Sequence, residues 1–216
     1  MKSWLLAAAL AITATTAAGA ELVVLWDQAA FDPAGAAGLA DAAAGCPTGA
    51  VSSHLASDFR LDSPVSIEQV TTWYSAAVPE SFAATAEAWL WVAPKQGELP
   101  ADGDDPRKAG RLVPVHTRRV GRCFVLVASD LALALRPGEY WISLTPVLPM
   151  GPRGPESHLT ALRAWGSPAA AYDPCGTRRW TAHAVGIDAT LKIEGTVGDP
   201  AGASTGGGPW LWRALR

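Results

Sequence analysis

The sequence predicts an all-β protein, a single antiparallel β-sandwich of jelly-roll type that follows a cleaved signal peptide. Two observations predict this fold. After residue 20, short apolar runs alternate with a period of two, are broken by clusters of Pro, Gly and Asp, and leave few helix signals. The 216 residues include 21 Gly and 17 Pro but only 17% charged residues, which is a composition that builds a folded core. Many strands without intervening helices favour one sandwich over two domains.

Residues 1–20 form the first predicted element, a secretory signal peptide. Lys2 gives a positive start, residues 4–14 form an apolar run, and Ala18-Gly19-Ala20 supplies the small residues of a cleavage site. This run is shorter than the roughly 20 apolar residues that cross a bilayer, and no later segment approaches that length. We therefore expect an exported protein (periplasmic, cell-surface or secreted) whose mature chain begins at Glu21 and has no transmembrane segment.

The sandwich domain is expected to span residues 21–197. Its predicted strands cover 22–26, 59–61, 65–74, 82–92, 111–116, 122–128, 131–135, 140–147, 158–165 and 186–197. The Ala-rich segment 34–44 is interrupted by glycines, so we expect a loop or one weak turn there. Arg136-Pro137-Gly138-Glu139 predicts a hairpin turn, because Pro presets φ at the second position and Gly accepts a positive φ at the third. Residues 198–216 read as a Gly-rich flexible tail.

The composition and motifs exclude several classes of function. Seventeen basic and 20 acidic residues give a net charge of −3, so nothing indicates a nucleic acid or anionic membrane partner. The G-x-S-x-G pattern at 202–206 lies in the tail rather than at a strand-to-helix elbow, so it does not indicate a hydrolase. No metal or cofactor is expected from motif spacing, although Asp27, Asp58 and Asp188 near strand ends leave open a scattered calcium site.

The three cysteines, Cys46, Cys123 and Cys175, all lie in the mature chain, where the environment is usually oxidising. Cys46 and Cys175 stand in turn-like Gly-Cys-Pro and Pro-Cys-Gly contexts, whereas Cys123 lies in an apolar run. We therefore predict a disulfide between Cys46 and Cys175 and a buried thiol at Cys123, while the other two pairings remain open.

Three segments carry a resemblance to a known family: Ala56-Ser57-Asp58-Phe59, residues 137–144 (PGEYWISL) and residues 188–195 (DATLKIEG). Together they resemble a group of exported bacterial β-sandwich domains that open with an Asp-Asp-Phe strand, carry a late Gly-x-Tyr-Trp strand and close on a strand ending in Gly. Such domains often occur in proteins with a PEP-CTERM sorting tail. Here Ser57 replaces the first Asp, and the sorting tail is missing. The resemblance implies an exported domain of a largely uncharacterised group, and it transfers no enzyme activity to this chain.

Tryptophan is the unusual signal, with ten in the chain. On the predicted strand 82–92, alternation places Phe82, Ala84, Ala86, Ala88, Leu90 and Val92 on one face and Glu87, Trp89 and Trp91 on the other. Trp141 has the corresponding position on strand 140–147. Because indole rings stack on sugar rings and a carboxylate accepts from sugar hydroxyls, Glu87, Trp89, Trp91 and Trp141 are candidate glycan-binding residues. The alternative is that both faces are covered and the tryptophans are packing residues.

The sequence therefore predicts an exported, non-catalytic binding or structural module of the cell envelope or extracellular space, with a polysaccharide or an envelope protein as its partner. Three classes remain open. An exposed Trp89 and Trp91 would favour a glycan-binding module, and an apolar patch without a groove would favour a structural protein that acts through protein contacts. Two carboxylates facing each other across roughly 5 to 9.5 Å in one cleft would favour a carbohydrate-active enzyme.

Overall fold

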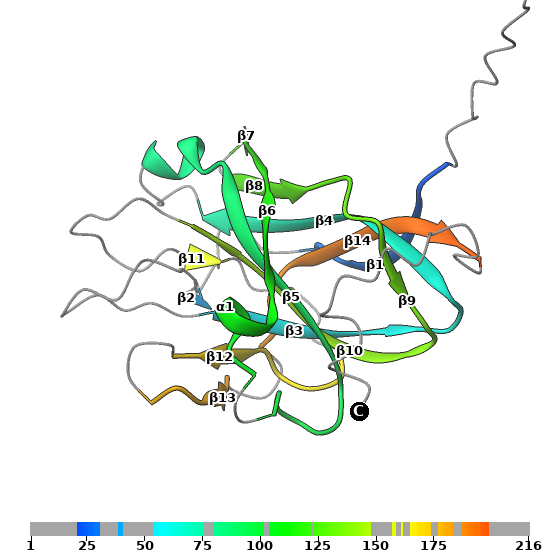
Figure 1. Ribbon diagram of the computed structural model, residues 1–216. Helices are drawn as coiled ribbons and strands as arrows, with labels where there is room; N and C mark the ends of the chain where they lie inside the picture. The colour runs from blue at the N-terminus through cyan, green and yellow to red at the C-terminus, as the bar shows by residue number, and fades with distance from the viewer. Residues whose placement is uncertain are drawn as a thin grey trace, which may run out of the picture.

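The computed structural model describes residues 21–30, 39–40, 54–75, 80–101, 104–121, 123–147, 157–158, 161, 165–173, 177–183 and 187–198. These residues form two antiparallel sheets that pack against each other, consistent with a β-sandwich, so the all-β prediction is confirmed (Figure 1). The predicted signal peptide and all of the predicted tail except Gly198 lie outside the described residues. Among the helices that the structure describes, none is long and apolar enough to cross a membrane.

The first sheet has eight strands and is organised around β4, which pairs with β14, β8, β9 and β11. The order β1-β14-β4-β11-β2 runs through it, and β7 adds to β8. Its strands are β1 (Val23–Gln28), β2 (Leu39–Ala40), β4 (Val65–Ser75), β7 (His116–Val120), β8 (Cys123–Ala128), β9 (Leu133–Leu135), β11 (Ser157–His158) and β14 (Leu191–Val197).

The second sheet has six strands in the order β13-β12-β3-β10-β5-β6. Its strands are β3 (His54–Leu61), β5 (Glu87–Pro94), β6 (Arg111–Pro114), β10 (Gly138–Pro146), β12 (Ala170–Tyr172) and β13 (Trp180–Ala182). The short helix α1 (Pro106–Ala109) lies against β5 and β6 (Figure 1). Asp105 caps this helix by accepting a hydrogen bond from the Arg107 amide at 3.0 Å.

The main core lies between the two sheets. Alternate residues of each strand point into it, and among its fully buried members are Phe59, Ile67, Val70, Tyr74, Phe82, Leu126 and Ile193. The alternation on β4 shifts once: Ile67 pairs with Gly195 but Gln69 pairs with Glu194, so Glu68 is an extra residue without a partner on β14. This bulge lets Ile67 and Val70 both face the core and turns Glu68 toward the surface.

The predicted hairpin at residues 136–139 is wrong, although a turn is present there. β9 pairs with β4 in the first sheet, whereas β10 lies between β3 and β5 in the second, so the two flanking strands do not pair with each other. Gly138 has φ +157°, and the Tyr140 hydroxyl donates to the Arg136 carbonyl at 2.9 Å. The turn therefore carries the chain from one sheet to the other.

Two predicted strands are divided. Strand 82–92 begins only at Glu87, because Glu80–Ala84 forms a 3₁₀ helix (η1) that places Phe82 in the core while Ala84 and Ala86 are exposed. Segment 111–116 is divided because β6 belongs to the second sheet and β7 to the first. β12 and β13 were not predicted, and they form an antiparallel pair beside β3.

Candidate functional site

The strand register places the predicted site residues on the outer face of the six-stranded sheet. Trp89 lies opposite Thr145, Trp91 opposite Ser143, and Trp141 opposite Ala93, so the three indoles share the face that points away from the main core. Ala88 and Leu90, which alternate with them, belong to the main core, as the sequence predicted. This common face is the surface on which glycan binding was predicted.

The outer face is covered around two of these tryptophans. Trp91 is 2% exposed and Trp141 is 1% exposed, and both belong to a second apolar cluster with Trp180 and Tyr172 of the β12–β13 pair. Trp180 stacks on Trp91 with ring centroids 5.2 Å apart and donates from Nε1 to the Asp104 carbonyl at 3.0 Å. The burial of Trp91 and Trp141 agrees with the alternative that both faces of the sheet are covered and these tryptophans are packing residues, although the strands that cover them were not predicted.

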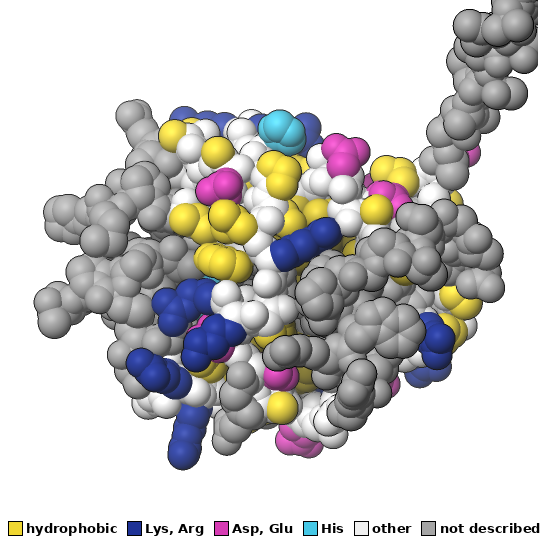
Figure 2. Space-filling view, viewed as in Figure 1, with side chains coloured by type: hydrophobic (Ala, Val, Ile, Leu, Met, Phe, Trp, Pro, Cys, Tyr) yellow, Lys and Arg dark blue, Asp and Glu magenta, His cyan; other side chains and the backbone are white. Residues whose placement is uncertain are grey.

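The remaining two predicted residues lie nearer the surface. Glu87 is exposed and Trp89 is half-buried, and Leu112 on the edge strand β6, opposite Trp89, is 43% exposed. On the side of the molecule that Figure 2 shows, Lys and Arg side chains gather around α1 and below it, and apolar side chains reach the surface in patches. Glu87 and Trp89 form the part of the predicted site that a ligand can reach.

A buried ion pair lies under the same face. Asp58, directly opposite Trp141 in the β3–β10 ladder, is fully buried and accepts from Lys95 Nζ and, at 3.0 Å, from the Ser167 amide. The Lys95 ammonium lies 5.4 Å from the centre of the Trp141 ring. A Cβ at Gly166, where φ is +67°, would lie 2.3 Å from Asp58 Oδ2, so only glycine permits this close approach.

Asp188 is a second fully buried carboxyl, close to β3 and β1. Burial raises its pKa to about 6, contacts with Ser57, Gln28 and the Ala189 amide lower the pKa in part, and the charge of Asp58 raises it. The Ala189 amide donates to Asp188 Oδ1 at 2.9 Å. The sequence left open a calcium site shared by Asp27, Asp58 and Asp188, and in the structure the charge of Asp58 acts on Asp188.

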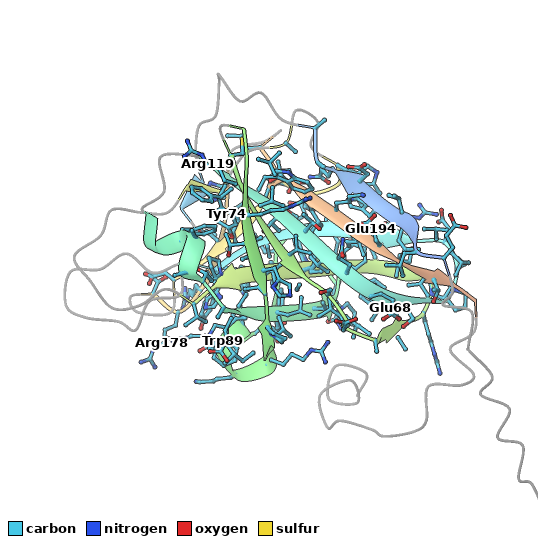
Figure 3. All side chains as sticks on the ribbon, turned by 90° about the horizontal axis from the view of Figure 1, so that it is seen from above. Glu68, Tyr74, Trp89, Arg119, Arg178 and Glu194 are labelled. Carbon is cyan, nitrogen blue, oxygen red and sulfur yellow. The ribbon has the colours of Figure 1, made fainter. Side chains whose placement is uncertain are left out.

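A groove of about 500 Å³ opens on the eight-stranded sheet, away from the tryptophans. It is lined by Leu22, Glu68, Gln69, Ser129, Asp130 and Thr196. Figure 3 shows Glu68 and Glu194 on the β4–β14 side of the molecule, whereas Trp89 lies near α1. The groove is thus distinct from the site that the sequence predicted.

One wall of this groove forms where the pairing of β4 passes from β8 to β9. β8 pairs with β4 as far as Val70 opposite Ala128, and β9 resumes the pairing at Ile67 opposite Leu133. Residues 129–132 therefore loop out opposite Glu68 and Gln69 alone. Asp130 and Ala132 have φ +56° and +49°, which non-glycine residues adopt at a cost in free energy. The Leu131 amide donates to the Glu68 carbonyl at 3.1 Å, which holds residues 129–132 against the bulge at Glu68.

Hydrogen bonds orient the side chains of the groove floor. Ser66 Oγ donates to Glu68 Oε1 at 2.7 Å, and Gln69 Nε2 donates to Glu194 Oε2 at 2.7 Å. Lys192 Nζ lies 2.7 Å from Glu194 Oε1, which balances that charge. The groove therefore offers carboxylate, amide and hydroxyl groups, several of them already fixed in position.

The other sequence predictions fall into two groups. Cys123 is buried on β8, as expected, whereas Cys46 and Cys175 lie outside the described residues, so their disulfide stays a prediction. Asp27 of the candidate calcium site is exposed, and its Oδ1 accepts from the Ala29 amide at 2.9 Å. Within the described ranges, no group of three or more His, Cys, Asp or Glu side chains could hold a metal ion.

Comparison with known proteins assigns no relative. No protein-family model matches the sequence, and no curated protein or solved structure shows significant similarity to it. The resemblance to exported bacterial β-sandwich domains therefore stays a prediction.

Proposed function

We propose that this protein is an exported, non-catalytic β-sandwich module that binds a glycan in the groove beside Glu68. The observation that carries the proposal is the lining of the groove by carboxylate, amide and hydroxyl side chains, with apolar contact from Leu22. Sugars present hydroxyls that both donate and accept hydrogen bonds and rings with an apolar face, so this lining suits them. Its volume also lies in the range of about 300–1,000 Å³ that is typical of ligand sites.

The groove replaces the tryptophan face as the proposed contact surface. A ligand cannot reach Trp91 and Trp141 without displacing Trp180 and Tyr172, which pack with them. Glu87 and Trp89 remain accessible and form the comparison surface in the experiment. Export is supported by the sequence of residues 1–20 alone.

The test is affinity electrophoresis of the chain from Glu21 onward in native gels that contain one neutral polysaccharide at a time. We expect one polysaccharide class to retard the protein. Asp130→Gly removes a carboxylate from the groove but suits the positive φ of this position, so the variant should fold and lose retardation. Ala132→Gly is the matched control, because it relieves the same kind of backbone strain without changing a groove side chain.

The outcomes separate the candidate surfaces. Retardation that persists in Asp130→Gly but disappears in Trp89→Ala would move the site to the outer face of the six-stranded sheet. Absence of retardation with every polysaccharide would overturn glycan binding. Release of reducing ends from a retarding polysaccharide would show catalysis, for which Glu68 and Asp130 are the carboxylates that line one groove.

A second candidate function, protein contact within the envelope, is favoured by an apolar edge. Leu22, Val23 and Val24 at the start of β1 are 45%, 43% and 53% exposed, and Val197 at the end of β14 is 60% exposed. Among the described strands, β1 pairs only with β14, so its other edge can accept a further strand. If this function holds, Val24→Asp abolishes complex formation in the exporting cell, whereas Val120→Asp, at a valine that is 48% exposed on β7, does not.

A further inference from the structure

Lys95 and Asp58 meet on the outer face of the six-stranded sheet, across the strand that separates them. Asp58 lies on β3, Lys95 directly follows β5, and β10 runs between these two strands. Trp141 of β10 lies opposite Asp58, and the Lys95 ammonium lies 5.4 Å from the centre of the Trp141 ring. Lys95 Nζ contacts Asp58 Oδ2. The amine and the carboxyl group of these side chains are therefore held against each other.

The pair is shielded from solvent. The Asp58 side chain is fully buried, that of Lys95 is 12% exposed, and Trp141 belongs to the apolar cluster on this face. Burial removes the hydration that favours charged groups, so a proton that moves from Nζ to the carboxylate replaces two buried charges by two neutral groups. A neutral lysine amine is a nucleophile, and a neutral carboxyl group is a better electrophile than a carboxylate.

Two further groups are placed to assist a reaction between these side chains. The Ser167 amide donates to Asp58 Oδ2 at 3.0 Å and stabilises the negative charge that gathers on this oxygen when the carboxyl carbon is attacked. Glu139 Oε2 lies 3.8 Å from Lys95 Nζ, and its side chain is 47% exposed, so it can accept a proton from the amine and return it. Asp58 Oδ1 has no hydrogen-bond partner among the described residues, so no hydrogen bond there retains it.

We propose that Lys95 and Asp58 condense to an intramolecular isopeptide bond. Nζ attacks Asp58 Cγ and forms a C–N bond, the Cγ–Oδ1 bond breaks, and Oδ2 remains as the amide oxygen that accepts from Ser167. Of the three protons on the Lys95 ammonium, one stays on the amide nitrogen. The other two leave with Oδ1 as water: one moves to the carboxyl group before the attack, and one passes through Glu139. The reaction needs no oxidant, and one neutral amide replaces two buried charges.

The bond ties β3 to the end of β5 across β10. Its two residues are 37 positions apart, so it restricts the unfolded chain as a disulfide of the same span does, but no reductant opens it. The site is independent of the glycan groove, which lies on the eight-stranded sheet, so either proposal can fail alone.

The test is the intact mass of the chain from Glu21 onward, measured after denaturation and reduction of the cysteines. Wild type should be lighter than its calculated mass by one water, about 18 Da. Lys95→Arg keeps a positive charge beside Asp58 but cannot form this bond, so it should have its full mass. Glu139→Gln removes the proton carrier and should leave most molecules at full mass. Glu98→Gln, the matched change at an exposed glutamate, should lose the water as wild type does.

Peptide mapping of the wild type makes the test independent of whether a variant folds. Proteolytic digestion should release one branched peptide in which the Lys95 side chain is joined to Asp58. A wild type of full calculated mass would overturn the proposal. A water loss that persists in Lys95→Arg, or that maps to cyclised Glu21 or to a succinimide at Asp58, would also overturn it, because neither product involves Lys95. A joined peptide that forms equally in Glu139→Gln would overturn the role of Glu139.

Discussion

Burial of the ionised Asp188 carboxylate should lower the stability of the folded protein at neutral pH. The Asp188→Asn substitution should remove this effect. Burial raises the pKa of Asp188 from 3.8 to about 6, so the folded state holds the proton more tightly than the unfolded state. The contribution of this group to stability is full below a pH of about 4 and is lost as the pH rises through about 6. A pKa difference of about two corresponds to about 3 kcal/mol at pH 8.

Asparagine has nearly the same shape and carries no charge, so its stability should not depend on this titration. Urea unfolding at about pH 4.5 and pH 8, at the same ionic strength, gives the difference in the free energy of unfolding between the two proteins. As the pH rises from about 4.5 to about 8, the free energy of unfolding of the variant should increase by about 2 kcal/mol relative to that of the wild type. Burial lowers the pKa of His183, but that group is present in both proteins and cancels. The reasoning would be refuted if the free energy of unfolding of the variant minus that of the wild type stayed constant or decreased as the pH rises.

Three further substitutions test the outer face of the six-stranded sheet. Lys95→Met should cost about 3–5 kcal/mol in urea unfolding, because it leaves Asp58 buried without its cation, and adding Asp58→Asn should recover much of this loss. Trp180→Ala should cost about 3–5 kcal/mol and shift tryptophan emission to the red as Trp91 becomes solvated; unchanged emission would contradict the observed stacking. Gly166→Ala should lower the Tm measured by circular dichroism, since its Cβ would overlap the Asp58 carboxylate, and an unchanged Tm would show that the loop can move aside.

Three of the long strands could be predicted closely from their apolar or alternating sequence. β4, β8 and β14 lie within the predicted segments 65–74, 122–128 and 186–197 to within a residue at most ends, because one face of each strand is buried in the core. The beginning of β5 could not be predicted, because Phe82, Ala84 and Ala86 fit the apolar face of the predicted strand but lie in or beside a 3₁₀ helix. Alternation over a few residues does not distinguish a strand from a short turn of helix that buries a single ring.

Local sequence signals could not predict which strands pair with each other. Pro137-Gly138 marks a turn correctly, but a turn does not determine whether its two flanks pair with each other or with strands of different sheets. The same limit applies to the outer tryptophans. Their common face followed from alternation, whereas their burial depends on Tyr172 and Trp180, which lie on three-residue strands too short to show a period.

The groove arises from a mismatch between strands that are distant in sequence, so no single segment could predict it. Glu68 becomes an extra residue only when β4 pairs with β14, and residues 129–132 loop out only because β8 and β9 share the same neighbour. The available signal was the polar pair Glu68-Gln69 in the middle of an apolar strand. A polar interruption of this kind indicates a local irregularity, and here it lies at the ligand-sized opening.

The six-stranded sheet lies between two apolar clusters, and this affects how the molecule opens with time. Its central strands β3 and β10 contribute side chains to the main core on one face and to the Trp91, Trp141 and Trp180 cluster on the other. Their amides can exchange with solvent only when both clusters separate, which requires unfolding of the whole domain. β1, at an edge with exposed apolar side chains, can detach while the rest persists. A protease or chaperone that meets this protein should therefore gain access to β1 before it gains access to β3.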